Sequence, residues 1–302
     1  MRPSTRHLSY TRAQLYVLSG TFLIAGAFIA SEKLAHVLNP FSLTLMRFVV
    51  AVLLLGPFVL FRARLRQETL RVLPRALIMG LFYSLYFMAM FHALKTTTVL
   101  NTSTLYTLVP FLTAVLSWVI FREKIGSRKL LVFAIGAVGT LWVIFEADIG
   151  RLIQFSLQEG DGIFLAGSFS MCLYAISIKF LHRNDHPLVL VFCTLIGGSL
   201  WMGLGLLLLQ EPLDWHVLTM EHWGYMLYLS IGTTIVTLYL LQSATIALGP
   251  VRVMSYVYLS PAMVACLAYC WEGKTISWIV VPGILLSALA TALLQRSLHV
   301  KT

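Results

Sequence analysis

Charged side chains are scarce in this sequence. Asp, Glu, Lys and Arg make up only 11% of its 302 residues, whereas about a quarter of the residues in a soluble globular domain are charged. Hydrophobic residues make up 59%, and the mean hydropathy is +0.85. A protein of this composition cannot cover its surface with water-facing groups. The sequence therefore excludes an ordinary soluble domain and predicts an integral membrane protein.

Patterns that carry catalysis or bind metal are also missing. The sequence contains no His-Glu-x-x-His motif and no pair of aspartates at membrane depth. Residues 167–170 (Gly-Ser-Phe-Ser) include a candidate nucleophile, but the histidine within an apolar segment, His92, belongs to another segment. The four cysteines lie in apolar stretches, where cysteine usually packs as a small hydrophobe. We therefore expect neither an intramembrane enzyme nor a metal or other cofactor.

Acidic residues are absent from the centre of every long apolar segment. Glu32, Glu146 and Glu272 lie near the ends of such segments. Proton-coupled antiporters commonly relay protons through a central carboxylate. The absence of one favours a facilitator driven by the gradient of its substrate.

Ten apolar segments are long enough to cross a bilayer as a helix, which takes about 20 residues. The first run starts at Ala13 and continues through Ala30, which favours a retained helix over a cleaved signal peptide. The predicted spans cover residues 13–31, 39–61, 74–94, 97–121, 128–146, 162–182, 187–209, 223–247, 250–271 and 276–295. The predicted fold is an all-α integral membrane protein with ten transmembrane helices.

The basic residues alternate between the two sides of these spans. With the N-terminus inside, only Lys33, Lys95, Arg151 and Lys274 lie outside, and Arg47 lies within a span. Every other lysine and arginine falls on the inner side, and basic loop residues mark the cytoplasmic face. The pattern predicts that both termini are cytoplasmic. It also assigns the net charge of +10 to membrane topology, so nucleic acid is not an expected partner.

The two halves of the sequence resemble each other. Residues 93–118 can be laid over residues 244–269 without gaps, and Pro110 then coincides with Pro261. This predicts two repeats of five helices, at residues 1–150 and 151–302. Because five is odd, the second repeat is inverted relative to the first. Secondary transporters built in this way bind their substrate near the midplane, where the repeats meet; duplication in a protein that transports nothing is the other interpretation.

Several short patterns occur in an order that resembles the EamA family of the drug/metabolite transporter superfamily. They are Lys33-Leu34-Ala35 followed by Pro40, Arg47 and Ala51; residues 93–98; Pro110 followed by Arg122-Glu123-Lys124; and Ala244, Pro261 and Glu272 in the second half. The sequence departs from the family where Leu23 or Ile24 replaces a first-helix tryptophan. The resemblance implies a transporter that works by alternating access in a bacterial inner membrane.

The substrate class stays open between two groups. An aromatic, polar-spotted cavity suits amino acids or related amphipathic metabolites, which the protein would export. The superfamily also includes carriers of sugar phosphates and nucleotide sugars, for which the sequence offers no cluster of lysines. The expected partners are a small-molecule solute and the lipid bilayer, and a homodimer is compatible with the sequence.

Arg47 is the outstanding candidate for the binding site. It lies about eight residues into its span, roughly 12 Å below the outer end at 1.5 Å per residue. A charge within the membrane defaults to a functional hypothesis. Arg47 either attracts a carboxylate or phosphate in a cavity, or holds backbone carbonyls of the first helix near Gly20 or Gly26.

Other polar side chains predict cavity-facing positions on several spans. Small hydroxyl groups also serve helix packing in membranes, so each has a structural alternative. The further substrate-binding candidates are Tyr83, Tyr86, Ser103, Thr107, Tyr174, Thr234, Gln242, Ser255 and Tyr258. Pro110 and Pro261 are the predicted helix breaks or hinges.

Overall fold

The computed structural model describes residues 8–35, 37–97, 99–122, 126–263, 266–267 and 278–297. Within these ranges the regular structure is entirely helical. Eight helical segments of this part are long and apolar enough to cross a membrane, judged by length and composition. The chain is therefore an all-α integral membrane protein, as predicted.

The first half of the chain contains six helices. They are α1 (Tyr10–Ala35), α2 (Pro40–Leu60), α3 (Ala63–Ala93), α4 (Val99–Tyr106), α5 (Val109–Phe121) and α6 (Ser127–Ile144). The short α7 (Ile149–Ile153) follows. Pro40 in the first turn of α2 and Asn39 as its N-cap, which accepts a hydrogen bond from the Ser42 amide at 2.8 Å, fix the start of that helix.

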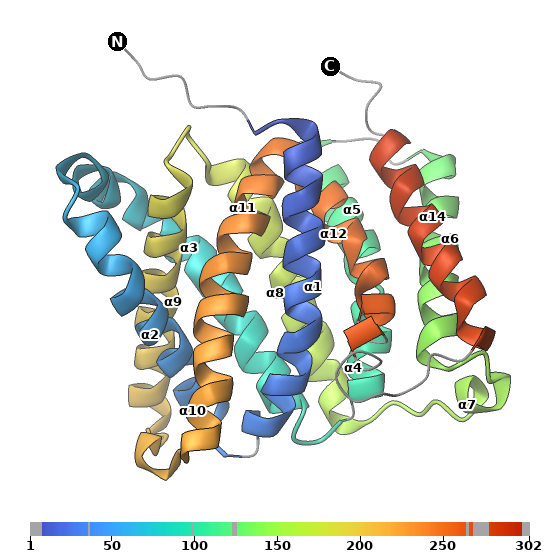
Figure 1. Ribbon diagram of the computed structural model, residues 1–302, viewed down its shortest axis with the longest axis horizontal. Coiled ribbons are helices and arrows are strands. Elements are labelled where there is room, and N and C mark those ends of the chain that lie inside the picture. Colours follow the sequence, from blue (N-terminus) through green and yellow to red (C-terminus); the bar gives the residue numbers. More distant parts are fainter. Residues whose placement is uncertain are drawn as a thin grey trace.

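The second half contains helices that are interrupted by π-helical and 3-10 segments. They are α8 (Glu159–Leu181), α9 (Pro187–Leu209), the 3-10 turn η1 (Trp215–Val217), α10 (Met220–Leu227), the π-helix η2 (Tyr228–Val236), α11 (Thr237–Leu248), α12 (Pro250–Met254), the 3-10 segment η3 (Ser255–Leu259), η4 (Trp278–Val280) and α14 (Val281–Ser297). The helical stretch formed by α10, η2 and α11 is continuous and crosses the molecule from one end to the other (Figure 1).

All ten predicted spans contain helix, and α3 differs most from its predicted limits. The predicted span 74–94 is longer, because α3 begins at Ala63. Its added turns bury Leu65, Thr69 and Val72 at helical spacing, which extends the packed face beyond the apolar stretch. The predicted span 250–271 runs into residues that lie outside the described part, so the total of ten stays a prediction.

The two halves of the chain share one packed core. Helix α3 packs against α8 and α9 of the second half, and α1 packs against α11 (Figure 1). The start of α1 and the end of α14 lie at the same end of the molecule, whereas α7 and α10 lie at the other end (Figure 1). This arrangement agrees with an even number of crossings and brings residues of both halves to the centre.

A buried carboxylate ties the start of α8 to the segment that follows α3. Asp161, which is 1% exposed, accepts hydrogen bonds from Thr97 Oγ1, from Asn101 Nδ2 at 2.8 Å and from the Gln158 amide at 2.7 Å. The last of these closes a capping box on α8. The sequence alone shows only an acid near a segment end, since the donors come from elsewhere in the chain.

Asp161→Asn should destabilise the protein by about 2 kcal/mol, because hydrogen bonds to a charged group each contribute roughly 1.5–3 kcal/mol. The NH2 group of the new side-chain amide would also face groups that are themselves hydrogen-bond donors. Thermal unfolding in detergent measures the effect. The matched control is Glu159→Gln, which removes the same charge from an exposed position in the same helical turn; an equal loss in both variants would contradict the role given to Asp161.

Candidate functional site

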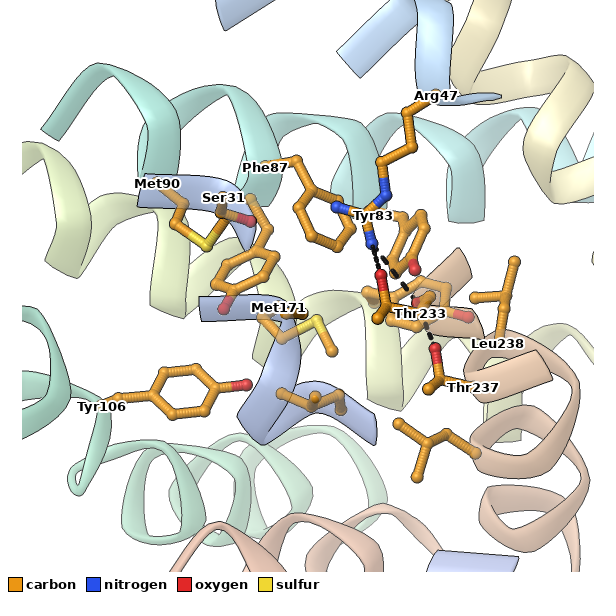
Figure 2. A pocket seen from close by; sticks show the side chains of 15 residues that line it. Ser31, Arg47, Tyr83, Phe87, Met90, Tyr106, Met171, Thr233, Thr237 and Leu238 are labelled. Atoms are coloured by element: carbon orange, nitrogen blue, oxygen red, sulfur yellow. Dashed lines mark hydrogen bonds between the residues drawn. The ribbon is translucent and has the colours of Figure 1, made fainter. Parts of the chain in front are cut away.

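A cavity lies at the centre of the bundle, between helices from both halves (Figure 2). The space open to the centre of a water-sized molecule is about 50 Å³, several times the roughly 10–15 Å³ that one enclosed water requires. The lining residues come from α1, α2, α3, α4, α8, η2 and α11: Ile24, Ala27, Ser31, Arg47, Tyr83, Tyr86, Phe87, Met90, Tyr106, Met171, Tyr174, Thr233, Thr237, Leu238 and Leu241.

Arg47 of α2 brings a positive charge to this cavity. The residue is 1% exposed. Its Nη2 donates to Thr233 Oγ1 at 2.8 Å, and its Nε donates to Thr234 Oγ1. The guanidinium carbon lies 4.2 Å from the centroid of the Phe87 ring, a cation–π contact. Nη1 has no hydrogen-bond partner among the described residues, so one donor group of the guanidinium is left for another molecule.

The π-helix η2 explains how two consecutive threonines reach the same guanidinium. Adjacent side chains on an α-helix point about 100° apart, but the wider π turn brings both hydroxyls toward Arg47. Thr233 and Thr234 each donate their own hydrogen to the Leu229 carbonyl, at 2.9 and 2.8 Å. Their oxygens are therefore free to accept from Arg47. At nine residues, η2 is longer than the single-turn π-bulges that are frequent at functional sites.

Aromatic rings of α3 form one wall of the cavity. The Tyr83 ring lies 4.9 Å from Phe87 and 4.8 Å from Tyr174 of α8, measured between centroids. Tyr86 lies 6.0 Å from Tyr106 of α4. The Arg47 guanidinium lies beside Phe87, Tyr83 and Thr233, while Tyr106 occupies the far side of the view (Figure 2). The cavity thus combines one charged end with a largely aromatic and apolar body.

Four of the predicted binding residues line this cavity: Arg47, Tyr83, Tyr86 and Tyr174. Two others stand directly behind it. Thr234 binds Arg47, and Gln242 donates to Tyr174 Oη at 2.9 Å and to Thr194 Oγ1 at 3.1 Å. The structure therefore gathers six of the ten predicted positions around one site.

The remaining candidates lie elsewhere or outside the described side chains. Thr107 donates to the carbonyl of Thr104, three residues earlier in the chain, at 2.7 Å. Ser255 accepts from Gln295 of α14, and Tyr258 donates to the Phe133 carbonyl of α6 at 3.1 Å. These bonds give Ser255 and Tyr258 a packing role beside α6 and α14. The side chain of Ser103 lies outside the described part of the structure.

Both predicted break points coincide with interruptions of helix. Pro110 stands in the first turn of α5, just after α4 ends at Tyr106. Pro261 follows the 3-10 segment η3. Beside η3, the hydroxyl oxygens of Thr140 and Thr291 lie 3.3 Å from the Tyr258 and Ser255 carbonyl oxygens, while each hydroxyl has a shorter bond to its own helix, at 2.8 Å to Gly136 and 2.9 Å to Ser287. Movement about these points stays a prediction.

Eleven of the fifteen lining residues were not among the predicted binding residues, and three of these are polar or aromatic groups beside the charged end or on α1: Ser31, Phe87 and Thr233. Phe87 follows Tyr83 by one helical turn, so its position on the same face could have been found. Ser31 carried no such signal. Within the described residues, no group of three His, Cys, Asp or Glu side chains is placed to hold a metal ion.

Comparisons with known proteins agree with this architecture. The model of the EamA-like transporter family matches residues 11–145 and 158–296. An uncharacterized transporter of Bacillus subtilis, YyaM, is 22% identical over 222 residues, which cover 72% of this chain and 73% of that protein. An uncharacterized transporter of Archaeoglobus fulgidus is 27% identical over 263 residues, covering 84% and 87%. A protein of known crystal structure shares the fold, with a TM-score of 0.73, 19% identity and coverage of 96% of this chain and 100% of that one.

Proposed function

This chain belongs to the EamA-like transporter family, and from that premise we propose that it exports amino acids or related amphipathic metabolites. The carrying observation is the Arg47 guanidinium, which keeps one nitrogen without a partner among the described residues at the charged end of an aromatic cavity. A carboxylate binds there, and the apolar part of the solute lies along Tyr83, Tyr86 and Met90. Bidentate or charge-assisted contacts of this kind are among the stronger interactions available to a small anion.

Alternating access supplies the transport step in this proposal. The cavity is lined by α1 to α4 of the first repeat (residues 1–150) and by α8, η2 and α11 of the second (151–302). Arg47 and its threonine partners join the two repeats directly. Rocking of one repeat against the other would then open the cavity to one side at a time, as in other transporters built from inverted repeats.

The proposal also covers the membrane in which the protein lies and the energy source that drives transport. We place the protein in a bacterial inner membrane, as the family resemblance implies, with both termini in the cytoplasm, which the distribution of basic loop residues supports. The cavity lining contains no carboxylate, which supports a facilitator driven by the substrate gradient. Nucleotide sugars and sugar phosphates are less well matched, because they bring two or more negative charges to a lining with a single cation.

Counterflow into liposomes tests the proposal. The purified protein is reconstituted, and uptake of radiolabelled phenylalanine, threonine and a nucleotide sugar is measured with and without a pH gradient. Amino-acid counterflow that is insensitive to the gradient supports the facilitator. Counterflow of the nucleotide sugar alone would replace the proposed substrate class, and a strict requirement for the gradient would replace the proposed energy source.

Tyr174→Phe should raise the half-saturating concentration of a carboxylate substrate by roughly tenfold or more, the range expected for the loss of one hydrogen bond to a charged group. The change removes the hydroxyl beside Gln242 and keeps the ring against Tyr83. Tyr239→Phe is the control, since Tyr239 also lies in the membrane region but is not a lining residue, and its ring lies tilted beside that of Tyr16, with 6.3 Å between centroids. A similar change in both variants would show that the effect is not local to the cavity.

A further inference from the structure

The cavity contains hydrogen-bond donors that have no partner among the described residues. Arg47 Nη1 and Ser31 Oγ are buried and have no partner among the described residues. Both residues line the cavity (Figure 2). Nη1 is a donor only, and a hydroxyl group can also donate. Two elements of the first repeat, α1 and α2, therefore present unused donors to the same space.

The Tyr174 hydroxyl adds a third donor, by an argument that fixes the orientation of Gln242. Thr194 Oγ1 donates its only hydrogen to the Leu190 carbonyl at 2.7 Å, so it must accept from Gln242 at 3.1 Å. The nearby atom of Gln242 is therefore its amide nitrogen, which also donates to Tyr174 Oη at 2.9 Å. The hydrogen of the Tyr174 hydroxyl is left to donate, and Tyr174 lines the cavity.

An ammonium group finds neutral hydroxyl groups in this lining, such as those of Tyr83, Tyr86 and Thr237, but no carboxylate to neutralise its charge. The lining residues include one cation and no acid. The guanidinium already lies over the Phe87 face at 4.2 Å, so that cation–π position is occupied. In an α-amino acid the ammonium is bonded to the carbon that carries the carboxylate. Docking the carboxylate on Arg47 would therefore hold two positive groups close together in a site of low dielectric, where like charges repel strongly.

We infer that the cavity selects organic monocarboxylates that carry an apolar or aromatic body and no ammonium group. Their carboxylate accepts from Arg47 Nη1, Tyr174 and Ser31, and their body lies against the aromatic wall. The inference rests on the proposed function and narrows it, since 2-hydroxy acids and similar compounds are among the amphipathic metabolites related to amino acids. It assigns Arg47 as the residue that makes the cavity select a negatively charged substrate.

Three compounds on one carbon skeleton test the inference. 3-Phenyllactate differs from phenylalanine by a hydroxyl in place of the ammonium, and phenylalaninol keeps the ammonium but lacks the carboxylate. Each is measured as a competitor and as a counterflow substrate at pH 7.5, with protein-free liposomes as the control for leakage. We expect 3-phenyllactate to be preferred over phenylalanine by at least tenfold, equivalent to about 1.4 kcal/mol, and phenylalaninol to be inactive.

Each outcome decides between the two proposals. Equal or better transport of phenylalanine, or any saturable transport of phenylalaninol, would overturn the inference and leave the proposed function standing. Loss of flux with all three compounds and with threonine would overturn both. Arg47→Gln provides a second measurement: it should abolish the preference for 3-phenyllactate. A preference that survives in a folded Arg47→Gln protein would show that another group reads the charge.

Discussion

Replacing Arg47 with alanine should reduce the transport efficiency for a carboxylate substrate by roughly 100-fold. A hydrogen bond to a charged group contributes about 1.5–3 kcal/mol, and about 2.7 kcal/mol corresponds to a factor of 100. The variant also removes the only cationic side chain of the cavity lining. Initial rates of counterflow at several substrate concentrations would show whether the loss lies in binding or in the maximal rate.

Arg47→Lys separates charge from geometry. Lysine keeps the charge but presents a compact ammonium, which cannot match the planar fork that binds Thr233 and Thr234 while lying over Phe87. We expect an intermediate loss of about tenfold. The predicted structural alternative, in which Arg47 holds carbonyls of the first helix near Gly20 or Gly26, was wrong in its partner, because Arg47 binds Thr233 and Thr234 of η2. A variant that loses stability but keeps the wild-type half-saturating concentration would favour a structural role for Arg47 as a link between α2 and η2. Thermal unfolding of each variant in detergent therefore accompanies the transport assay.

Gly80→Ala should be the most damaging single substitution in the packing of the bundle. A Cβ at this position of α3 would lie 2.6 Å from the Gly198 amide nitrogen, 2.7 Å from the Thr194 carbonyl oxygen and 2.8 Å from the Gly197 carbonyl carbon. All three atoms belong to the backbone of α9, so no side chain can rotate away. The two helices would have to separate, and we expect a cost of about 3 kcal/mol or more.

The measurement is the midpoint of thermal unfolding in detergent, followed by tryptophan fluorescence. A loss of 3 kcal/mol corresponds to a drop of about 5 °C for a chain of this length, because the entropy of unfolding is about 2.1 cal/mol/K per residue. Gly203→Ala is the matched control on α9, because a Cβ there would meet no atom within 4 Å. That control should be neutral or slightly stabilising, since alanine is a better helix former than glycine by about 1 kcal/mol. Equal midpoints for both variants would refute the close packing of α3 on α9.

Hydropathy and charge were sufficient to predict the membrane class and most helix positions. The predicted limits of residues 187–209 agree with α9, because proline starts that helix and the apolar run ends with it. The extension of α3 before residue 74 was not predicted, since its residues are rich in arginine. Helical spacing of buried Leu65, Thr69 and Val72 was the available signal, but hydropathy outweighed it in the prediction.

Site residues could be predicted where a local feature of the sequence marks them. They could not be predicted where their position depends on contacts between segments far apart in the chain. Arg47 was found because an intramembrane charge is rare, and Tyr83 and Tyr86 were found because they share a helix face. Thr233 was missed because its orientation depends on a π-helix, which no local pattern in the sequence announced. Ser255 and Tyr258 were predicted to face the cavity because they are polar side chains on an apolar span, yet their neighbours in the structure are α6 and α14.

The separation along the chain between Arg47 and its partners has a consequence for biosynthesis. Thr233 lies 186 residues downstream, so α2 enters the bilayer long before its guanidinium can be bound. Inserting a central arginine costs about 2.5–3.5 kcal/mol, while each Leu, Ile, Phe or Val contributes about −0.3 to −0.6. Helix α2 contains 13 such residues and has the highest mean hydropathy of the eight candidate spans, 2.3. The apolar residues of α2 therefore offset the cost of inserting Arg47 while the second half of the chain is still being synthesised.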